Sequence, residues 1–466
     1  MRGSTTLLAL ALWPLWPLTV QAQLTLAEAL HVADRAAYAN RTAGAEAVRA
    51  TALRGAPLSG VLPSVRVEGG YFRTTDPIAA FGTRLKQREI AQSDFDPRRL
   101  NFPDAIGNYA AGVVVEQPLF NADSWIARRA MTRSASAAES TADWTRLSIR
   151  VDVIRAYYGA VLAAERITTL DAAVDAARAH LRDAEAMVRA GMATKSDALL
   201  ASVKAGELEA QRFDAQSDAT VARRQLALLI GQGAGAEPAL PARLPPANTI
   251  RALAAPDTLD YAPGQRADVG AARLQVEAAR ADLHRARSLY LPRLNAFARY
   301  DWNSPERVYA GDRSWTIGVL ASWSPFEGAS QLTETQAAGA RLNLALAAAD
   351  AATGQAGLEA VRSLATLKSA LARLAITERA VAQSAEAHRI VARKYQGGLA
   401  TAVELLDAAA VETQSALALS SAQFATIAAT ADRRRALGRD PGAMAILDGT
   451  TPIADASNRL PGAIPR

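Results

Sequence analysis

The residue types that most often carry catalysis or bind metals are few in this chain and poorly spaced for either task. It has no cysteine, and its four histidines, His31, His180, His284 and His388, are scattered along predicted helices without the spacing of metal ligands. The glycine-rich run 231–235 superficially resembles a phosphate-binding loop, but it follows a predicted helix instead of a strand. No set of nucleophile, base and acid stands out. We therefore expect no enzyme activity, no cofactor and no bound metal.

One pair of acids has a spacing with a clear geometric consequence. Glu404 and Asp407 lie three residues apart at the start of a predicted helix over 401–438, so that both side chains share one helix face. Such a pair concentrates negative charge on that face. A solvated helix face with no further role is the alternative.

The N-terminal segment has the pattern of an export signal. A short basic start is followed by an apolar run over 7–20 that two prolines interrupt, and Val20-Gln21-Ala22 supplies small residues for cleavage. We expect a signal peptide over 1–22 and a mature chain that starts at Gln23; an uncleaved membrane anchor is the alternative. Because the chain lacks cysteine, a lipid anchor on an N-terminal cysteine is excluded.

The composition of the remaining chain limits its location and its partners. No stretch reaches the roughly 18–20 continuous apolar residues that a membrane-spanning helix needs. An exported chain of this kind is periplasmic, secreted, or a β-barrel of the outer membrane. The net charge is only +6, from 52 basic and 46 acidic residues. Since no basic block is interleaved with aromatic residues, nucleic acid is not an expected partner.

The chain repeats one plan. Leu62-Pro63 opens a strand-like run and Leu291-Pro292 opens its counterpart, while a turn at 190–194 is matched by a turn at 397–401. Each half reads as helix, two strands, long helix, tight turn and return helix, which indicates a duplicated unit. The predicted organisation is a first repeat over 23–231, a connecting segment of irregular structure over 232–264, a second repeat over 265–438 and a similar irregular tail over 439–466.

Long helices dominate both halves. From Ile149 to Val188, small and apolar residues recur at alternating spacings of four and three, which is typical of a coiled coil, and many of them are alanine. The run 121–190 contains no proline and would span about 100 Å as a helix. We expect Gly191 and Gly398 to end the long helices and return helices to follow them near 195–231 and 401–438.

Four short segments alternate between apolar and polar residues, as strands with one apolar face do. In the clearest of them, Trp315 and Trp323 bound an apolar face and lie about 27 Å apart along a strand. That distance is close to the roughly 25 Å height of an apolar membrane belt between aromatic girdles. The residues expected to form the girdle are Tyr71, Tyr109, Tyr300, Trp302, Trp315 and Trp323. A small soluble sheet with one buried face is the alternative, although no nearby sequence would cover the polar faces.

Four strands cannot close a barrel, and open strand edges cannot lie in lipid. The sequence therefore predicts that copies of the chain join edge to edge. The expected fold is mainly α with a small β part: long coiled-coil helices and four β-strands per protomer. A periplasmic or secreted coiled-coil scaffold is the competing hypothesis, which explains the helices but not the strands bounded by aromatic residues.

Over about residues 24–438 the chain resembles the TolC family of outer-membrane efflux and secretion channels. The most specific match runs from Tyr395 to Ala408, where a tyrosine precedes a small-Gly turn and two acids follow three residues apart. The resemblance implies a homotrimer in the cell outer membrane, whose 12-stranded transmembrane β-barrel continues as a helical tunnel in the periplasm. It also implies passive conduction, in efflux or type I secretion, with a periplasmic adaptor protein and an inner-membrane pump as partners.

The same resemblance implies roles for residues at the two predicted tips. Those matching the closed periplasmic aperture are Glu404, Asp407, Ser196, Asp197 and Tyr395. Those matching the turns that contact the adaptor are Gly191, Met192, Gly398 and Leu399. Ala400 stands in the turn where one member of the family has a basic residue, so a salt-bridged lock on that residue is not expected, and Lys195 is the replacement that the sequence offers.

The segment 74–108, between the first two strands, is much longer than its counterpart over 303–314. Outer-membrane barrels keep their long loops outside the cell. We therefore expect this segment at the outer mouth, as a partial lid.

Overall fold

The computed structural model describes residues 23–233, 235–254, 266–308 and 311–448. The predicted signal peptide over 1–22, part of the connecting segment and most of the tail lie outside the described residues. In chain order the elements are α1 (Leu26–Ala36), α2 (Tyr38–Leu53), η1 (Ala56–Gly60), β1 (Ser64–Thr74), α3 (Pro77–Lys86), η2 (Gln92–Phe95), α4 (Pro97–Asn101), β2 (Ile106–Phe120), α5 (Ala122–Arg189), α6 (Lys195–Leu229), α7 (Ala247–Leu253), α8 (Ala267–Ser288), β3 (Arg293–Ser304), β4 (Asp312–Ser322), α9 (Ser330–Gln396), α10 (Ala402–Ala436) and η4 (Pro441–Asp448).

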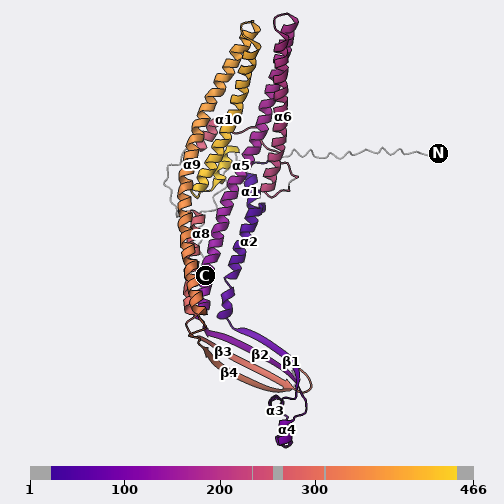
Figure 1. Ribbon diagram of the computed structural model, residues 1–466, viewed down its shortest axis with the longest axis vertical. Coiled ribbons are helices and arrows are strands. Elements are labelled where there is room, and N and C mark those ends of the chain that lie inside the picture. Colours follow the sequence, from indigo (N-terminus) through magenta and orange to yellow (C-terminus); the bar gives the residue numbers. More distant parts are fainter. Residues whose placement is uncertain (1–22, 234, 255–265, 309–310, 449–466) are drawn as a thin grey trace, which may run out of the picture.

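The molecule is long and narrow, with a four-stranded sheet at one end and two helical hairpins reaching away from it (Figure 1). One hairpin is α5–α6 and the other is α9–α10. The elements α8, β3, β4, α9 and α10 follow the same order as α2, β1, β2, α5 and α6. The long helices α5 and α9 have 68 and 67 residues, and both return helices have 35. The predicted mainly α fold with a small β part is confirmed. Within the described ranges, no helix is both long and apolar enough to cross a membrane.

The coiled-coil seam predicted along α5 is confirmed. Every seam position from Ile149 to Val188 is buried or half-buried, and α5 runs unbroken from Ala122 to Arg189. Return helix α6 packs along it through buried alanines such as Ala201 and Ala219. Because alanine side chains are short, the helix axes can lie close together.

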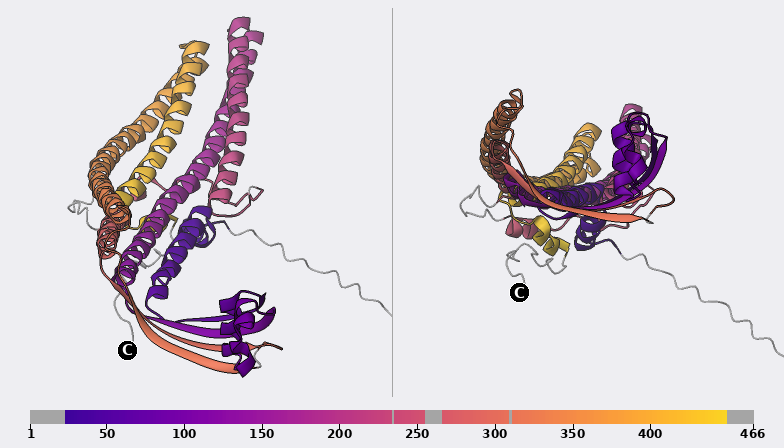
Figure 2. Two further views of the ribbon diagram at one scale, coloured as in Figure 1. Left: turned by 60° about the horizontal axis from the view of Figure 1, so that its bottom comes forward. Right: turned by 90° about the horizontal axis from the view of Figure 1, so that it is seen from below.

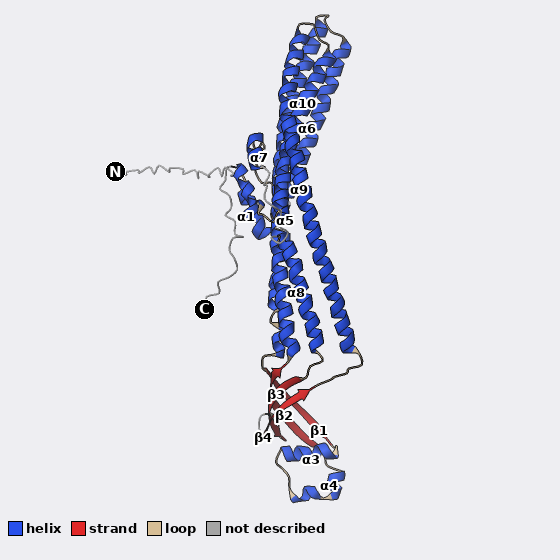
Figure 3. Ribbon diagram, turned by 90° about the vertical axis from the view of Figure 1, so that its left-hand side faces the viewer, coloured by secondary structure: helices blue, strands red, loops and turns tan. Residues whose placement is uncertain are grey.

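The main apolar core lies near the middle of the long axis, where short elements pack against α5 and α10. Tyr157 and Tyr158 of α5 are fully buried there, and their hydroxyls donate to the carbonyl of Leu24 at 2.9 Å and to Asp448 at 2.8 Å. Helices α1 and α7 lie beside the long helices in this region (Figure 3). The prediction of irregular structure was wrong for two stretches, because α7 forms in the connecting segment and η4 in the tail. Both bury apolar side chains in this core.

The sheet is antiparallel throughout, in the order β1-β2-β3-β4, and it curves across its width (Figure 2). Directly opposite residues share a face, so the register fixes both faces. Val67 pairs with Val113, Val113 with Tyr300, and Tyr300 with Trp315. The four apolar faces predicted from the sequence therefore lie on one side of the sheet.

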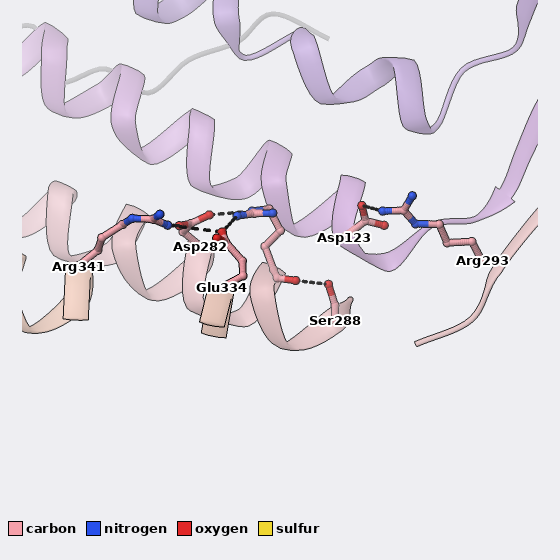
Figure 4. Close-up of polar contacts among 7 residues, drawn as sticks. Asp123, Asp282, Ser288, Arg293, Glu334 and Arg341 are labelled. Atoms are coloured by element: carbon pink, nitrogen blue, oxygen red, sulfur yellow. Dashed lines mark hydrogen bonds and ion pairs between the residues drawn. The ribbon is translucent and has the colours of Figure 1, made fainter. Parts of the chain in front are cut away.

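Ion pairs fasten the helices together next to the sheet. Arg293, at the start of β3, contacts Asp123 in the first turn of α5 at 2.7 Å. Further along, Arg285 of α8 contacts Glu334 of α9 at 2.8 Å, and Arg341 of α9 contacts Asp282 of α8 at 3.1 Å (Figure 4). These contacts join α5, α8, α9 and β3 where the strands turn into helices.

Candidate functional site: the sheet faces and the helical tips

The apolar face of the sheet is uncovered in the single chain. On the edge strand β4, Trp315 and Ile317 are 70% and 71% exposed, and on the edge strand β1, Val67 is 63% exposed. A soluble sheet of this size would bury such a face. Among the described elements, none packs on it. The alternative of a small sheet with one buried face therefore lacks the layer that would bury it.

The predicted girdle residues lie on this face at two levels. Tyr71 and Tyr109 pair across β1 and β2 with ring centroids 4.7 Å apart, at the end of the sheet remote from the helices. Tyr300 and Trp302, also 4.7 Å apart, lie near that end, and Trp315 is opposite Tyr300. These five residues form one aromatic group.

The helix-side end of the sheet carries fewer aromatic residues. Trp323 lies just beyond β4, where its indole N–H donates to the carbonyl of Tyr290 at 3.1 Å. Phe120, exposed at the end of β2, is a member of this level that the sequence analysis did not include in the girdle. Its aromatic type at a predicted strand end was the signal.

The opposite face of the sheet is polar and carries paired charges. Arg299 contacts Asp301 at 2.8 Å on β3, and Arg66 lies 3.8 Å from Glu68 on β1. The register places the two arginines at one level and the two acids at the next. The sequence analysis noted the polar alternation but did not identify this two-level arrangement.

The segment 74–108 is folded over the polar face at the end of the sheet remote from the helices. It contains α3, η2 and α4 and is held by buried amides. The Gln87 amide donates to Asn108 at 2.9 Å, and the Asn108 amide donates to Asn303 at 2.9 Å. All three side chains are buried. Arg88 adds an ion pair to Asp312 on β4 at 3.4 Å. The segment is therefore an ordered cap on the sheet.

The two helical tips share one turn design. Gly191 and Gly398 have φ of +71° and +72°, the left-handed conformation that glycine adopts without strain. In each turn the next amide returns to a carbonyl five residues back: Met192 to Met187 at 2.9 Å, and Leu399 to Lys394 at 2.8 Å. Met192 and Leu399 are exposed at the two ends.

Each return helix then starts with a capping box. The Asp197 carboxylate accepts from the backbone N–H of Thr194 at 2.9 Å, and the Glu404 carboxylate accepts from that of Thr401 at 2.7 Å. These hydrogen bonds to the charged form lower the pKa of both carboxyl groups below their ordinary values. The pattern Thr-x-x-acid was visible in the sequence and predicts such a cap. Glu404 therefore has a local structural role, whereas Asp407 is exposed with no hydrogen bond or ion pair to the described chain.

Tyr395 is buried at the tip, 6% exposed, against Ala402, Leu405 and Met187. Its hydroxyl has no hydrogen-bond partner among the described residues. Burial, with Asp197 and Asp183 nearby, raises the pKa of Tyr395. The structure thus brings Tyr395 near Asp197 but forms no hydrogen bond between them. Ser196 and Lys195 are exposed beside it.

Two histidines that look unrelated in sequence meet between the hairpins. The rings of His180 on α5 and His388 on α9 lie 5.5 Å apart in a T-shaped arrangement, and Nδ1 of His388 is hydrogen-bonded to Glu412 of α10. Both border a cavity of about 680 Å³ between the hairpins. Burial, and then His388, lower the pKa of His180. Within the described ranges, no three His, Cys, Asp or Glu side chains form a group that could hold a metal ion.

A family model matches most of the chain. The model of the outer membrane efflux protein family matches residues 41–232 and 259–439. A curated relative, the fusaric acid resistance protein FusA of Burkholderia cepacia, is 27% identical over 313 residues, which cover 60% of this chain and 56% of that protein. The match thus spans just over half the length of that relative.

Solved structures share the fold at low sequence identity. The CmeC outer membrane channel of Campylobacter jejuni has a TM-score of 0.74 at 16% identity and covers 89% of this chain and 85% of its own. VceC of Vibrio cholerae has a TM-score of 0.72 at 22% identity, covering 89% and 96%. A membrane protein from Pseudomonas aeruginosa has a TM-score of 0.75 at 20% identity, covering 91% and 98%.

Proposed function

Because this chain belongs to the outer membrane efflux protein family, we propose that it is one subunit of a homotrimeric channel in the outer membrane. Three sheets join edge to edge into a 12-stranded barrel, and the hairpins of three copies form a tunnel in the periplasm. The channel conducts passively, and the energy comes from an inner-membrane pump connected through a periplasmic adaptor protein.

The uncovered apolar face of the sheet is the observation that carries this proposal. Edge strands β1 and β4 each have one paired side, and large apolar side chains stand exposed along both strands. In lipid, every backbone N–H and C=O needs a partner, because an unpaired group costs several kcal/mol. Pairing β1 of one copy with β4 of the next satisfies both edges and turns the apolar face toward lipid. The paired charges on the other face then line the lumen.

We further propose that the helical tips form the inner mouth. Three copies bring six turns together, with Gly191-Met192 and Gly398-Leu399 as the adaptor contacts. The buried Tyr395 packs against Met187 of the other hairpin and holds the two hairpins of a protomer in the closed arrangement, while Asp197 caps the start of α6. Of the two acids, Asp407 makes no hydrogen bond or ion pair within the described chain, and only the charge of Lys204 acts on it from nearby, so it is the one that faces passing cations most directly.

Efflux is the transport role that the relatives support, since the family is described as efflux proteins and FusA as a resistance protein. Small organic molecules are accordingly the proposed cargo. The scaffold hypothesis explains the long helices but leaves the exposed apolar face of the sheet without an explanation.

Bilayer conductance of the purified protein tests the proposal. We expect the protein to stay in membranes during carbonate extraction, to migrate as a trimer in detergent, and to form discrete ion-conducting channels in planar bilayers. Release by carbonate, or a monomer without conductance, would reject the channel.

A further inference from the structure

A basic cavity lies between α5 and α8, close to the helix-side end of the sheet. Its volume is about 640 Å³. It is lined by Ile126, Arg129 and Arg133 of α5 and by Glu277, Arg280, Ala281 and His284 of α8. Three guanidinium groups therefore face one carboxylate.

The charges in this cavity are only partly neutralised. Arg133 contacts Glu277 at 3.0 Å. The side chains of Arg129 and Arg280 are exposed and make no hydrogen bond or ion pair with any residue that the structure describes. The neighbouring arginines between α8 and α9 differ, because Arg285 and Arg341 are both paired with acids (Figure 4). Two unpaired guanidinium groups around a cavity are an arrangement that suits a phosphate group.

The cavity opens on the outer side of the helical wall. Seen along the long axis, the long helices form an arc, and the short elements α1 and η4 lie on its convex side (Figure 2). Tyr158 of α5 points to η4 through its bond to Asp448, and Arg133 lies 25 residues, or about seven helical turns, before it on the same face. On α8, which packs between α5 and α9, Arg280 lies two residues from Asp282, which contacts α9, so Arg280 points away from α9 toward the side of α5.

With the sheet in the membrane, as the proposed function has it, the cavity lies at the depth of a membrane surface. Arg129 is seven residues into α5, about 10 Å from the end of the sheet. Between the sheet and the cavity stand the exposed aromatic side chains of Trp125, Tyr290 and Trp323. Tryptophan and tyrosine concentrate where lipid headgroups meet the hydrocarbon. An arginine one or two turns beyond them reaches the headgroup phosphates with its flexible stem.

We propose that this cavity is a binding site for the phosphate group of an anionic phospholipid in the membrane leaflet next to the helices. Arg129 and Arg280 bind the phosphate, and Trp125 contacts the start of the acyl chains. The site rests on the proposed function, because that function places the sheet in the membrane. Three copies present three such sites around the channel and fix its depth in the membrane.

Native mass spectrometry of the delipidated trimer in detergent tests the site, with phosphatidylglycerol as the probe. We expect up to three tightly bound lipids per trimer. The double variant Arg129→Gln/Arg280→Gln should bind phosphatidylglycerol at least roughly tenfold more weakly than the unaltered protein, since two charge-assisted hydrogen bonds are lost. The matched control is Arg128→Gln/Arg273→Gln, which removes the same charge from exposed arginines that do not line the cavity. It should bind as the unaltered protein does.

Two further measurements separate the site from general charge attraction. Glu277→Gln removes the carboxylate of the cavity and should tighten phosphatidylglycerol binding severalfold, a gain that a misfolded variant would not give. Phosphatidylcholine, which carries no net charge, should bind much more weakly. Equal losses in the two double variants, or no gain with Glu277→Gln, would overturn the site.

The source of the phosphate is tested by inorganic phosphate. It should not displace phosphatidylglycerol at millimolar concentration, and efficient displacement would show a site for a free anion instead. Failure of the site is distinguishable from failure of the channel. A protein that conducts but binds no phosphatidylglycerol rejects the site alone, whereas a protein that neither trimerises nor conducts rejects the channel.

Discussion

At the residue scale, the histidine pair makes the contact between the two hairpins sensitive to pH. The pKa of His180 is lowered in the folded protein by burial and by His388, against an ordinary value of about 6.5. The folded state therefore binds fewer protons than the unfolded state, and stability is complete above about pH 6.5 and falls as the pH drops below it. The charged groups next to the pair are Glu412 and Asp183, and the same cavity is also lined by Glu165, Lys204, Glu207 and Arg243.

We expect the Tm to be lower at pH 5 than at pH 7.5. The variant His180→Gln should show a smaller difference between the two pH values, because it lacks the imidazole whose pKa is lowered by burial. Differential scanning calorimetry of the trimer at both values measures this. The variant His31→Gln, which changes an exposed histidine of α1, is the control and should retain the full difference. A difference as large in His180→Gln as in His31→Gln would show that the histidine pair has no such role.

The tip acids give a second residue-scale prediction. Asp407→Asn should weaken the block of conductance by multivalent cations severalfold, because an unbonded carboxylate is removed from the inner mouth. Glu404→Gln should have a smaller effect, because the amide oxygen can still accept from Thr401 and preserve the cap. Block by hexaamminecobalt in planar bilayers measures both. Asp350→Asn, far along α9 from the tip, is the control and should leave the block unchanged. If the block is also unchanged in Asp407→Asn, Asp407 does not line the inner mouth.

At the scale of elements, the tip turns depend on one glycine each. Gly398→Ala should destabilise its turn by about 1 kcal/mol, because Gly398 has φ of +72°, which alanine adopts only with strain. An added Cβ at Gly398 has no atom within 4 Å, so the backbone strain is the only expected effect. Gly397→Ala is the matched control, since Gly397 has φ of −86°. Hydrogen exchange over residues 394–402 measures the difference. Equal protection in the two variants would contradict the turn geometry.

The cap formed by 74–108 gives the second prediction for an element. Replacing Gln87 by Leu leaves Asn108 and the carbonyl of Gly107 without a buried donor and should weaken docking of the segment by about 1–3 kcal/mol. We expect faster proteolysis within 77–101 and a higher or noisier single-channel conductance. Lys86→Gln, at the exposed neighbouring position, should leave both unchanged. If Gln87→Leu conducts as the unaltered channel does, the cap does not narrow the outer mouth.

The sequence predicted the elements better than the contacts between them. Alternation with period two placed Trp315, Ile317 and Val67 on the apolar faces of their strands, and the proline-free run 121–190 gave the length of α5 to within a residue at each end. Contacts between distant segments could not be obtained this way. His180 and His388 lie on different hairpins, and no periodicity within one helix fixes which neighbour it meets. The hydrogen bonds from Gln87 to Asn108 and from Asn108 to Asn303 could not be predicted for the same reason, because they join segments that are distant in the sequence. The capping box of α10 is a local feature, and the spacing of Thr401 and Glu404 predicts it from the sequence alone, although the sequence analysis did not include it.

At the scale of the whole molecule, the unpaired sheet edges predict how copies join. The chain has no native cysteine, so one cysteine on β1 at Val67 and one on β4 at Trp315, Ile317 or Val319 report edge pairing cleanly. Within one sheet, β1 and β4 are three strand spacings apart, about 14 Å, too far for a disulfide. Under oxidation in membranes, at least one pair should give covalent species that stop at three chains. Monomer alone for all three pairs would contradict barrel closure.

The matched lengths of the helices have a mechanical consequence. Both hairpins start at the same sheet and have the same rise per residue, so the two tip turns of each subunit lie at one level. A threefold assembly would therefore end in a flat rim of six turns. A partner can then press against all six bends at once. Removing one heptad from each arm of a single hairpin would leave that rim uneven by about 10 Å, and a seal that needs simultaneous contact would leak even if each remaining bend were unaltered.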